Sequence, residues 1–124
     1  MTKTFAVAGA IIAGLAVASG AFGAHAMASR LDERMLDIWE TAARYQMYHG
    51  LALFVAAWLA GQTAHSSASV AGWSFIVGTL VFSGSLYTLA LTGTRWLGAV
   101  TPMGGVAFLV GWIACIVAAL NIDS

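Results

Sequence analysis

The chain has 124 residues, of which 60% are hydrophobic and only 8% are charged. Soluble domains usually contain about a quarter charged residues, so this composition excludes an ordinary soluble globule and indicates a small integral membrane protein. Five Lys and Arg balance five Asp and Glu, which leaves no net charge for binding nucleic acid. The length suits a single domain that covers residues 1–124.

Four apolar runs without charged residues predict four transmembrane helices. A bilayer core about 30 Å thick requires roughly 20 helical residues. The predicted spans are residues 4–24, 45–61, 70–91 and 101–120. Because the runs are continuously apolar, they do not match the alternating pattern of β spans. We therefore expect an all-α integral membrane four-helix bundle.

The first run also resembles a cleavable signal peptide. Lys3 precedes the apolar stretch, and Ala24-His25-Ala26 resembles a cleavage site. The apolar stretch is longer than the usual signal core of about 7–15 residues. We therefore expect the first run to remain in the protein as an uncleaved transmembrane helix.

Residues 29–44 hold seven of the ten charged residues. Apolar residues recur there at helical spacing, with the charged residues on the opposite face. This pattern predicts an amphipathic helix in the membrane interface between the first and second spans, with Trp39 at headgroup depth. Ser29 and Asp32 resemble a capping box at its start. The alternative interpretation is a solvated arm of a helical hairpin.

Thr101 and Pro102 suit the N-cap and the first position of the fourth helix. This interpretation places residues 97–100 in the approach to the helix rather than within it.

Small residues recur on one face of the first and fourth spans, a pattern that allows helix backbones to approach closely in lipid. In the first span, Ala6, Ala10, Gly14 and Ala18 repeat every four positions. Such faces either close the bundle within one chain or join protomers of a homo-oligomer or a larger membrane complex. The glycines that we expect to pack against helices are Gly14, Gly20, Gly23, Gly84, Gly104, Gly105 and Gly111.

Polar side chains gather around the junction of the amphipathic segment and the second span. The spacing of Tyr45 and His49 places both on one helical face, and an antiparallel first helix brings His25 to the same membrane face. We expect these groups to form a ligand or partner site, or a hydrogen-bonded network that secures the helix junction. The candidate residues are His25, Glu40, Arg44, Tyr45, Gln46, Tyr48 and His49.

Motifs for catalysis are missing from the sequence, which lacks the phosphate-binding, zinc-protease, serine-hydrolase and dinucleotide-binding signatures. The single cysteine, Cys115, lies among apolar residues and forms no CxxC pair, so we interpret it as a packing residue. His25 and His49 could ligate a haem as axial ligands. Apart from this haem hypothesis, we expect no cofactor, no metal site and no enzymatic activity.

Four segments in order along the chain are distinctive: Gly20-Ala-Phe-Gly-Ala-His25, Trp39-Glu-Thr-Ala-Ala-Arg-Tyr-Gln-Met-Tyr-His49, Phe82-Ser-Gly-Ser-Leu-Tyr87 and Leu97-Gly-Ala-Val-Thr-Pro-Met-Gly-Gly105. Together they resemble the YgdD-like family, small bacterial inner-membrane proteins with a domain of unknown function. The resemblance implies a four-helix protein of the inner membrane and no established activity or cofactor. The family-like positions are Gly23, His25, Tyr45, Gln46, Tyr48, His49, Ser83, Gly84, Tyr87, Thr101, Pro102 and Gly105.

Arg44 departs from the family pattern, in which a small or uncharged residue, often Gln, is expected at this place. A mechanism that depends on Arg44 would therefore not be common to the family.

Three functions are compatible with these features. The leading hypothesis is a non-catalytic membrane protein that contacts lipids or helps to assemble a larger complex. The alternatives are a small oligomeric transporter or channel, and a haem or redox subunit that uses His25 and His49.

The distribution of basic residues predicts the orientation. Arg30, Arg34, Arg44 and Arg95 lie on one side of the membrane, whereas only Lys3 lies on the other. The positive-inside rule then places both termini and residues 62–69 in the periplasm.

Overall fold

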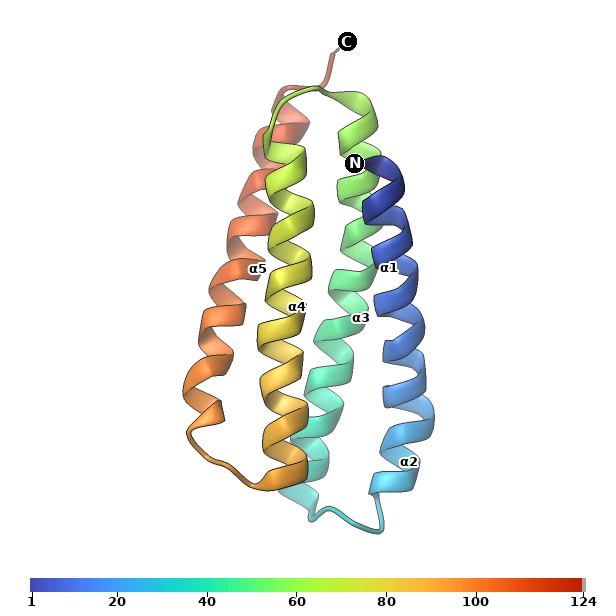
Figure 1. Ribbon diagram of the computed structural model, residues 1–124, viewed down its shortest axis with the longest axis vertical. Helices are drawn as coiled ribbons and strands as arrows, with labels where there is room; N and C mark the ends of the chain where they lie inside the picture. Colours follow the sequence, from blue (N-terminus) through green and yellow to red (C-terminus); the bar gives the residue numbers. More distant parts are fainter. Residues whose placement is uncertain (124) are drawn as a thin grey trace.

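The computed structural model describes residues 1–123, which form helices joined by short connections (Figure 1). No strand occurs in this part of the chain, so the all-helical expectation is confirmed. The helices are α1 (Thr2–Val17), η1 (Ala18–Gly23), α2 (Ala24–Met27), α3 (Glu33–Gln62), α4 (Ser67–Thr92) and α5 (Leu97–Leu120).

The first predicted span lies inside a longer helical rod formed by α1, η1 and α2 in succession. The six residues of η1 form a π-helical turn, in which the Ala24 N–H donates to the Ser19 carbonyl oxygen. A π turn widens a helix locally and shifts the direction of the side chains that follow. The rod reaches Met27, three residues beyond the predicted end of the span.

The long helices lie side by side in the order α1, α3, α4 and α5, and each packs mainly against its neighbours in this series (Figure 1). The chain runs up and down, so both termini lie at one end of the molecule (Figure 1). The connections between α2 and α3 and between α4 and α5 lie at the opposite end (Figure 1). We refer to this second end as the charged end, because Arg30, Arg34 and Arg95 lie in or beside its connections.

A separate amphipathic helix over residues 29–44 was expected, but α3 runs without interruption from Glu33 to Gln62. Neither Gly nor Pro occurs between Glu33 and His49, so nothing in the backbone breaks the helix where the charges stop. The expected capping box starting at Ser29 is also wrong. Asp32 is the N-cap, and its Oδ1 accepts a hydrogen bond of 2.8 Å from the Met35 N–H.

The start of α5 also differs from the expectation. The helix begins at Leu97, so Pro102 lies inside it rather than at its first position. Proline there leaves the carbonyl of Gly98 without its helical N–H partner, and Gly98 is exposed, so the lost bond does not bury an unpaired group. Thr101 donates its hydroxyl to the Leu97 carbonyl oxygen at 3.2 Å instead of capping the helix.

Among residues 1–123, three helical segments are long and apolar enough to cross a membrane: Thr2–Met27, Ser67–Thr92 and Leu97–Leu120. The expected spans 4–24, 70–91 and 101–120 lie within them. The fourth long helix, α3, is not among them, because its first third is charged and it carries Gln46 and His49 farther along. Both of these polar side chains are buried among neighbouring helices.

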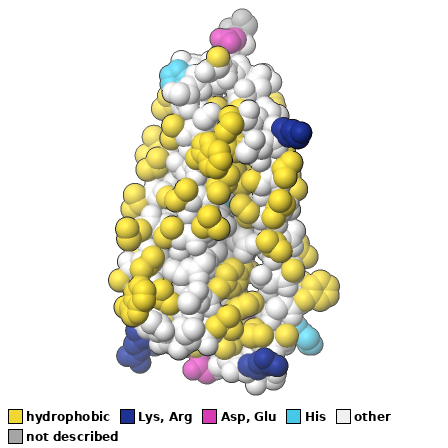
Figure 2. All heavy atoms as spheres, in the orientation of Figure 1, with side chains coloured by type: hydrophobic (Ala, Val, Ile, Leu, Met, Phe, Trp, Pro, Cys, Tyr) yellow, Lys and Arg dark blue, Asp and Glu magenta, His cyan; other side chains and the backbone are white. Residues whose placement is uncertain are grey.

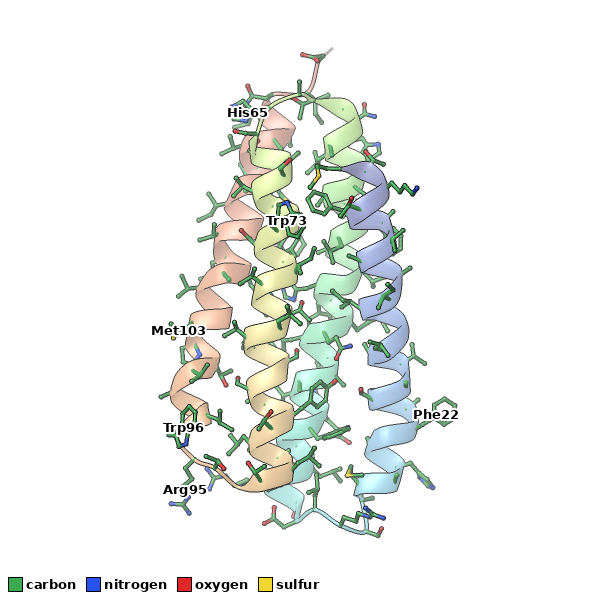
Figure 3. All side chains as sticks on the ribbon, viewed as in Figure 1. Phe22, His65, Trp73, Arg95, Trp96 and Met103 are labelled. Atoms are coloured by element: carbon green, nitrogen blue, oxygen red, sulfur yellow. The ribbon has the colours of Figure 1, made fainter. Side chains whose placement is uncertain are left out.

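The outer surface between the two ends is apolar. Figure 2 shows hydrophobic side chains along the length of the molecule, with the charged side chains toward its ends. Leu80 on α4, Leu109 on α5 and Ile11 on α1 are more than half exposed. Phe22 is 74% exposed and extends away from the helices (Figure 3). A surface of this size and composition suits contact with lipid rather than with water.

Phenylalanine rings packed on glycines join the helices. The ring of Phe5 on α1 lies on Gly72 of α4. Between α4 and α5 the contact is reciprocal. A Cβ atom at Gly111 would lie 2.5 Å from Cε1 of Phe75, and one at Gly78 would lie 2.5 Å from Cδ1 of Phe108. Only a residue without a side chain leaves room for these rings.

The glycines expected to pack against helices fall into two groups. A Cβ atom at Gly104 would meet the Phe82 backbone N at 2.5 Å, and one at Gly23 would meet the Trp39 ring at 3.0 Å. Gly111 packs on Phe75 as described, and Gly20 makes only an ordinary contact with Ala43. Nothing lies within 4 Å of a Cβ atom built at the remaining three, which are Gly14, Gly84 and Gly105.

The closest approach of α1 to α3 occurs at two glycines that the sequence pattern had not indicated. A Cβ atom at Gly50 would lie 2.8 Å from the Ala13 backbone N, and one at Gly9 would lie 2.8 Å from the Gly50 carbonyl oxygen. The two backbones are therefore in direct contact at this point.

Glycines packed closely against a neighbouring helix and glycines with open space around them should respond in opposite ways to an added methyl group. Gly111→Ala forces Phe75 to move, and we expect it to lower the free energy of unfolding by about 1–3 kcal/mol. Gly84→Ala is the matched control, because open space surrounds its Cβ position and Ala favours the helix by up to about 1 kcal/mol. Thermal unfolding in mild detergent measures both. Equal melting temperatures for the two variants would contradict this account of the α4–α5 contact.

Candidate functional site

Two polar side chains one helical turn apart on α3 bond to different neighbouring helices and organise the interior. Gln46 is 7% exposed and His49 is 4% exposed. Burying such groups is costly unless they form hydrogen bonds, so their partners determine what each can do.

Gln46 connects three helices. Its amide nitrogen donates to the Ile12 carbonyl oxygen of α1 at 3.0 Å, and its Oε1 accepts the hydroxyl of Tyr87 on α4 at 2.7 Å. The side chain of Gln46 therefore uses both ends of its amide group between helices that are not neighbours along the chain. This arrangement is a structural clamp.

A second set of contacts extends the clamp toward the charged end. The indole N–H of Trp39 donates to the Ser19 carbonyl oxygen at 2.9 Å, the same oxygen that the π turn uses. The rings of Trp39 and Tyr87 meet edge to face, with centroids 4.7 Å apart. Ser83 of α4 also donates to the Ala42 carbonyl oxygen of α3 at 2.7 Å. The π turn is thus fixed to α3, which is in turn fixed to α4.

The hydrogen-bond partners of His49 determine its tautomer. Nδ1 lies 2.8 Å from the Tyr45 carbonyl oxygen, which can only accept, so Nδ1 carries the hydrogen. Nε2 accepts the indole N–H of Trp112 at 3.2 Å, so it carries a lone pair. The imidazole is therefore neutral, and the protein itself occupies both ring nitrogens.

Aromatic rings surround the His49 imidazole. Phe108 is stacked on it, with centroids 3.5 Å apart and planes inclined by 4°. Phe75 and Trp112 lie at centroid distances of 5.6 Å and 6.0 Å. Tyr45 lies one helical turn away on α3 and packs against Phe82 at 4.7 Å. The rings come from α3, α4 and α5, so the site depends on the packing of these three helices.

Beside these rings lies an open hollow of about 420 Å³, which we call the aromatic groove. Its opening faces outward between α3 and α5, two helices that touch only slightly. Trp112 and Tyr48 are both partly exposed at its edge. Its lining residues are Tyr45, Tyr48, His49, Phe82, Gly105, Phe108, Leu109 and Trp112.

The structure divides the seven candidate residues among four places. Tyr45, Tyr48 and His49 line the aromatic groove, and Gln46 forms the clamp to α1 and α4. Glu40 and Arg44 line a separate hollow against α1, which Tyr48 also reaches.

His25 is not part of this group. It is exposed near the end of α2, whereas His49 lies 16 residues, or about 24 Å, along α3 from its first residue. The expectation assumed that the second span began at Tyr45 at the level of His25. Because α3 begins at Glu33 instead, Tyr45 and His49 lie deeper in the bundle.

Several residues that build the site had not been indicated by the sequence. Phe108 and Trp112 are four residues apart on α5, the same spacing as Tyr45 and His49 on α3. Matching aromatic pairs on two helices were the signal that could have indicated a shared site. The roles of Trp39 and Ser19 depend on the π turn, for which the sequence carries no comparable signal.

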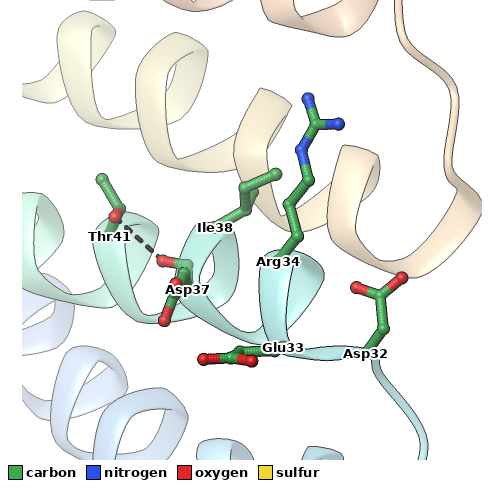
Figure 4. Close-up of a pocket in the computed structure, with 6 residues that line it drawn as sticks. All are labelled: Asp32, Glu33, Arg34, Asp37, Ile38 and Thr41. Carbon is green, nitrogen blue, oxygen red and sulfur yellow. Dashed lines mark hydrogen bonds between the residues drawn. The ribbon is translucent and has the colours of Figure 1, made fainter.

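Another hollow, of about 540 Å³, lies at the charged end (Figure 4). Its charged lining residues are all exposed, so it is a surface depression rather than an enclosed site. Asp32, Glu33, Arg34, Asp37, Ile38 and Thr41 line it. Within residues 1–123, no three His, Cys, Asp or Glu side chains lie close enough together to hold a metal ion.

Comparison with known proteins identifies relatives along nearly the whole chain. The family described as "Protein of unknown function (DUF423)" matches residues 19–105. UPF0382 membrane protein YwdK of Bacillus subtilis is 48% identical over 120 residues, which cover 96% of this chain and 98% of the relative. UPF0382 membrane protein SERP0230 of Staphylococcus epidermidis is 48% identical over 119 residues, covering 96% and 97%. None of the solved structures matches this chain significantly.

The clamp makes a specific prediction about stability. Gln46→Leu removes both interhelical hydrogen bonds, and we expect it to lower the free energy of unfolding by about 1–2 kcal/mol. Tyr87→Phe removes one of them and should cost less. Combined in one chain, the two substitutions should cost less than the sum of their separate effects, because they share a bond. Chemical unfolding in detergent measures all three variants, with Thr88→Val on the exposed face of α4 as control. Strict additivity would contradict the clamp.

Proposed function

Because the chain belongs to the DUF423 family, whose similar relatives are named UPF0382 membrane proteins, we propose that it is a non-catalytic protein of the inner membrane that holds a lipid chain in its aromatic groove. The YgdD-like proteins that the sequence resembles are, on this proposal, members of the same family. Four helices cross the bilayer, α3 included.

The proposal that α3 crosses the membrane is supported by the direction of its side chains. In its second half the outward residues are large and apolar, among them Leu51, Phe54 and Trp58. The buried positions of this half are mostly small, such as Ala52, Ala56 and Ala57. With 30 residues, α3 is about 45 Å long, which exceeds the hydrocarbon core and leaves its charged first turns at the interface.

The aromatic groove carries the proposal. It opens outward between α3 and α5, at the depth where the outer surface of the helices is apolar. Its walls are mainly aromatic rings, and the one histidine among them has both nitrogens occupied. Such a groove offers packing surface and no free base or charge. A hydrocarbon chain from the bilayer suits these walls, and it is the occupant to which we commit.

His49 has both ring nitrogens hydrogen-bonded within the protein, so it offers no free base in the groove, which supports a non-catalytic role. An axial haem ligand needs a free imidazole nitrogen, and both ring nitrogens of His49 are hydrogen-bonded, which disfavours the haem hypothesis. His25 lies at a different level of the molecule from His49.

A second candidate is a role in assembly, which one observation favours. Ala10 and Gly14 of α1 and Ala18 at the start of η1 form an exposed stripe of small residues. Small residues at this spacing allow another membrane helix to approach closely. On this alternative the protein forms a homo-oligomer or joins a larger complex, and an oligomeric transporter belongs to the same class.

The positions of the arginines predict on which side of the membrane the termini lie, and fusion reporters can measure this. Both termini lie opposite the charged end, where Arg30, Arg34 and Arg95 are found, so the positive-inside rule places the termini in the periplasm (Figure 1). A C-terminal alkaline phosphatase fusion should be active and a C-terminal green fluorescent protein fusion dark. The opposite pair of results would reverse the topology. If reporters at the two termini showed them on opposite sides of the membrane, α3 would not be a span.

Filling the groove should displace its occupant. Gly105 lines the groove, and a Cβ atom built there has no neighbour within 4 Å, so Gly105→Leu adds a side chain at the wall of the groove. We expect this variant to keep its fold and to retain fewer phospholipid molecules per protomer. Gly84→Leu is the matched control, because it also has open space but lies outside the groove. Native mass spectrometry in mild detergent measures bound lipid and oligomeric mass together. Unchanged lipid retention with a changed oligomeric mass would favour the assembly role.

A further inference from the structure

A small cavity at the charged end brings two arginines together. It has a volume of about 200 Å³ and lies between the first turns of α3 and the connection from α4 to α5. Arg34 comes from α3 and Arg95 from the connection, so the two are distant in sequence. The walls between them are mainly apolar. The lining residues are Arg34, Met35, Ile38, Leu89, Arg95 and Gly98.

Three carboxylates lie near Arg34: Asp32, Glu33 and Asp37 line the neighbouring hollow at the charged end together with it. Asp32 uses its Oδ1 to cap α3 through the Met35 N–H. The side chain of Arg34 extends away from the carboxylates of Glu33 and Asp37 (Figure 4). The lining of the small cavity itself holds the two arginines and no carboxylate.

Two guanidinium groups around one cavity form a binding site for an anion with several oxygens. The planar guanidinium donates paired hydrogen bonds to phosphate oxygens, and a bound anion also relieves the repulsion between the two cations. A phosphate group is the anion that this geometry and charge suit best.

The surroundings indicate where such a phosphate comes from. Trp96 follows Arg95, is 66% exposed and lies at the charged end (Figure 3). Tryptophan at this position is typical of the membrane interface. Met35, Ile38 and Leu89 supply apolar walls that a free phosphate ion would not need. Basic pockets between membrane helices at the cytoplasmic surface are known sites for anionic headgroups.

We propose that Arg34 and Arg95 bind the phosphate of an anionic phospholipid in the leaflet at the charged end. The headgroup lies between the two guanidinium groups, and the glycerol and upper acyl region rests on Met35, Ile38 and Leu89. This inference rests on the membrane-spanning arrangement of the proposed function but not on the aromatic groove.

The experiment compares lipid binding of arginine variants in nanodiscs. The full chain is placed in phosphatidylcholine nanodiscs with or without phosphatidylglycerol, and bound phosphatidylglycerol is measured by native mass spectrometry. We expect Arg34→Gln and Arg95→Gln each to weaken its retention about tenfold, because each removes a charge-assisted contact. Arg44→Gln is the matched control, since Arg44 is equally exposed but lines a different hollow.

Three results would overturn the proposal. Equal weakening by Arg44→Gln would mean that only total positive charge matters. Unchanged retention in both Arg34→Gln and Arg95→Gln, with folding verified by circular dichroism, would remove the site. Competition by free glycerol 3-phosphate at the affinity of the lipid would assign the cavity to a soluble phosphate compound.

Two further variants separate binding at the arginines from effects on folding and from lipid binding in the aromatic groove. Arg34→Lys keeps the charge but loses the paired donors, so its retention should lie between that of the original chain and Arg34→Gln. Gly105→Leu should leave phosphatidylglycerol binding at the charged end unchanged. If Gly105→Leu abolished this binding, the lipid would belong to the groove and the arginine site would be refuted.

Discussion

The contact of phenylalanine rings with glycines is the constraint on which the rest of the structure depends. In lipid, hydrophobicity does not draw helices together, so close van der Waals packing must do so. The reciprocal pairs Phe75–Gly111 and Phe108–Gly78 determine how α4 and α5 align. The same two rings lie against the imidazole of His49, with centroids at 5.6 Å and 3.5 Å. Packing between α4 and α5 therefore also builds the wall of the aromatic groove.

Hydrogen bonding adds the second level of organisation, and it centres on α3. Gln46 and His49 are three residues apart and reach different partners, Gln46 on α1 and α4 and His49 on α5. Every polar atom of these two side chains that could be left without a partner in lipid has one within the protein. The histidine in the wall of the groove consequently adds no unpaired nitrogen to it.

The sequence predicts the position of a helix well where a long uncharged apolar run defines it. Residues 70–91 lie within α4, which extends beyond them by three residues at one end and one at the other. Composition misleads at residues 29–44, because charges mark the membrane boundary whereas helices end where backbone hydrogen bonding fails. Tyr45 and His49 could be grouped from their spacing on one helix. The same spacing places Phe108 and Trp112 on one face of α5, but that this face meets α3 depends on the glycine contacts.

The central position of α3 follows from its composition. The apolar rods Thr2–Met27, Ser67–Thr92 and Leu97–Leu120 have the hydropathy of independent spans, whereas α3 does not. A helix carrying Gln46 and His49 would expose hydrogen-bonding groups to lipid if it had only one neighbour, because the partners of the two side chains lie on different helices. Between α1 on one side and α4 with α5 on the other, both side chains have partners. The least apolar helix is thus placed where its neighbours supply the partners that lipid cannot.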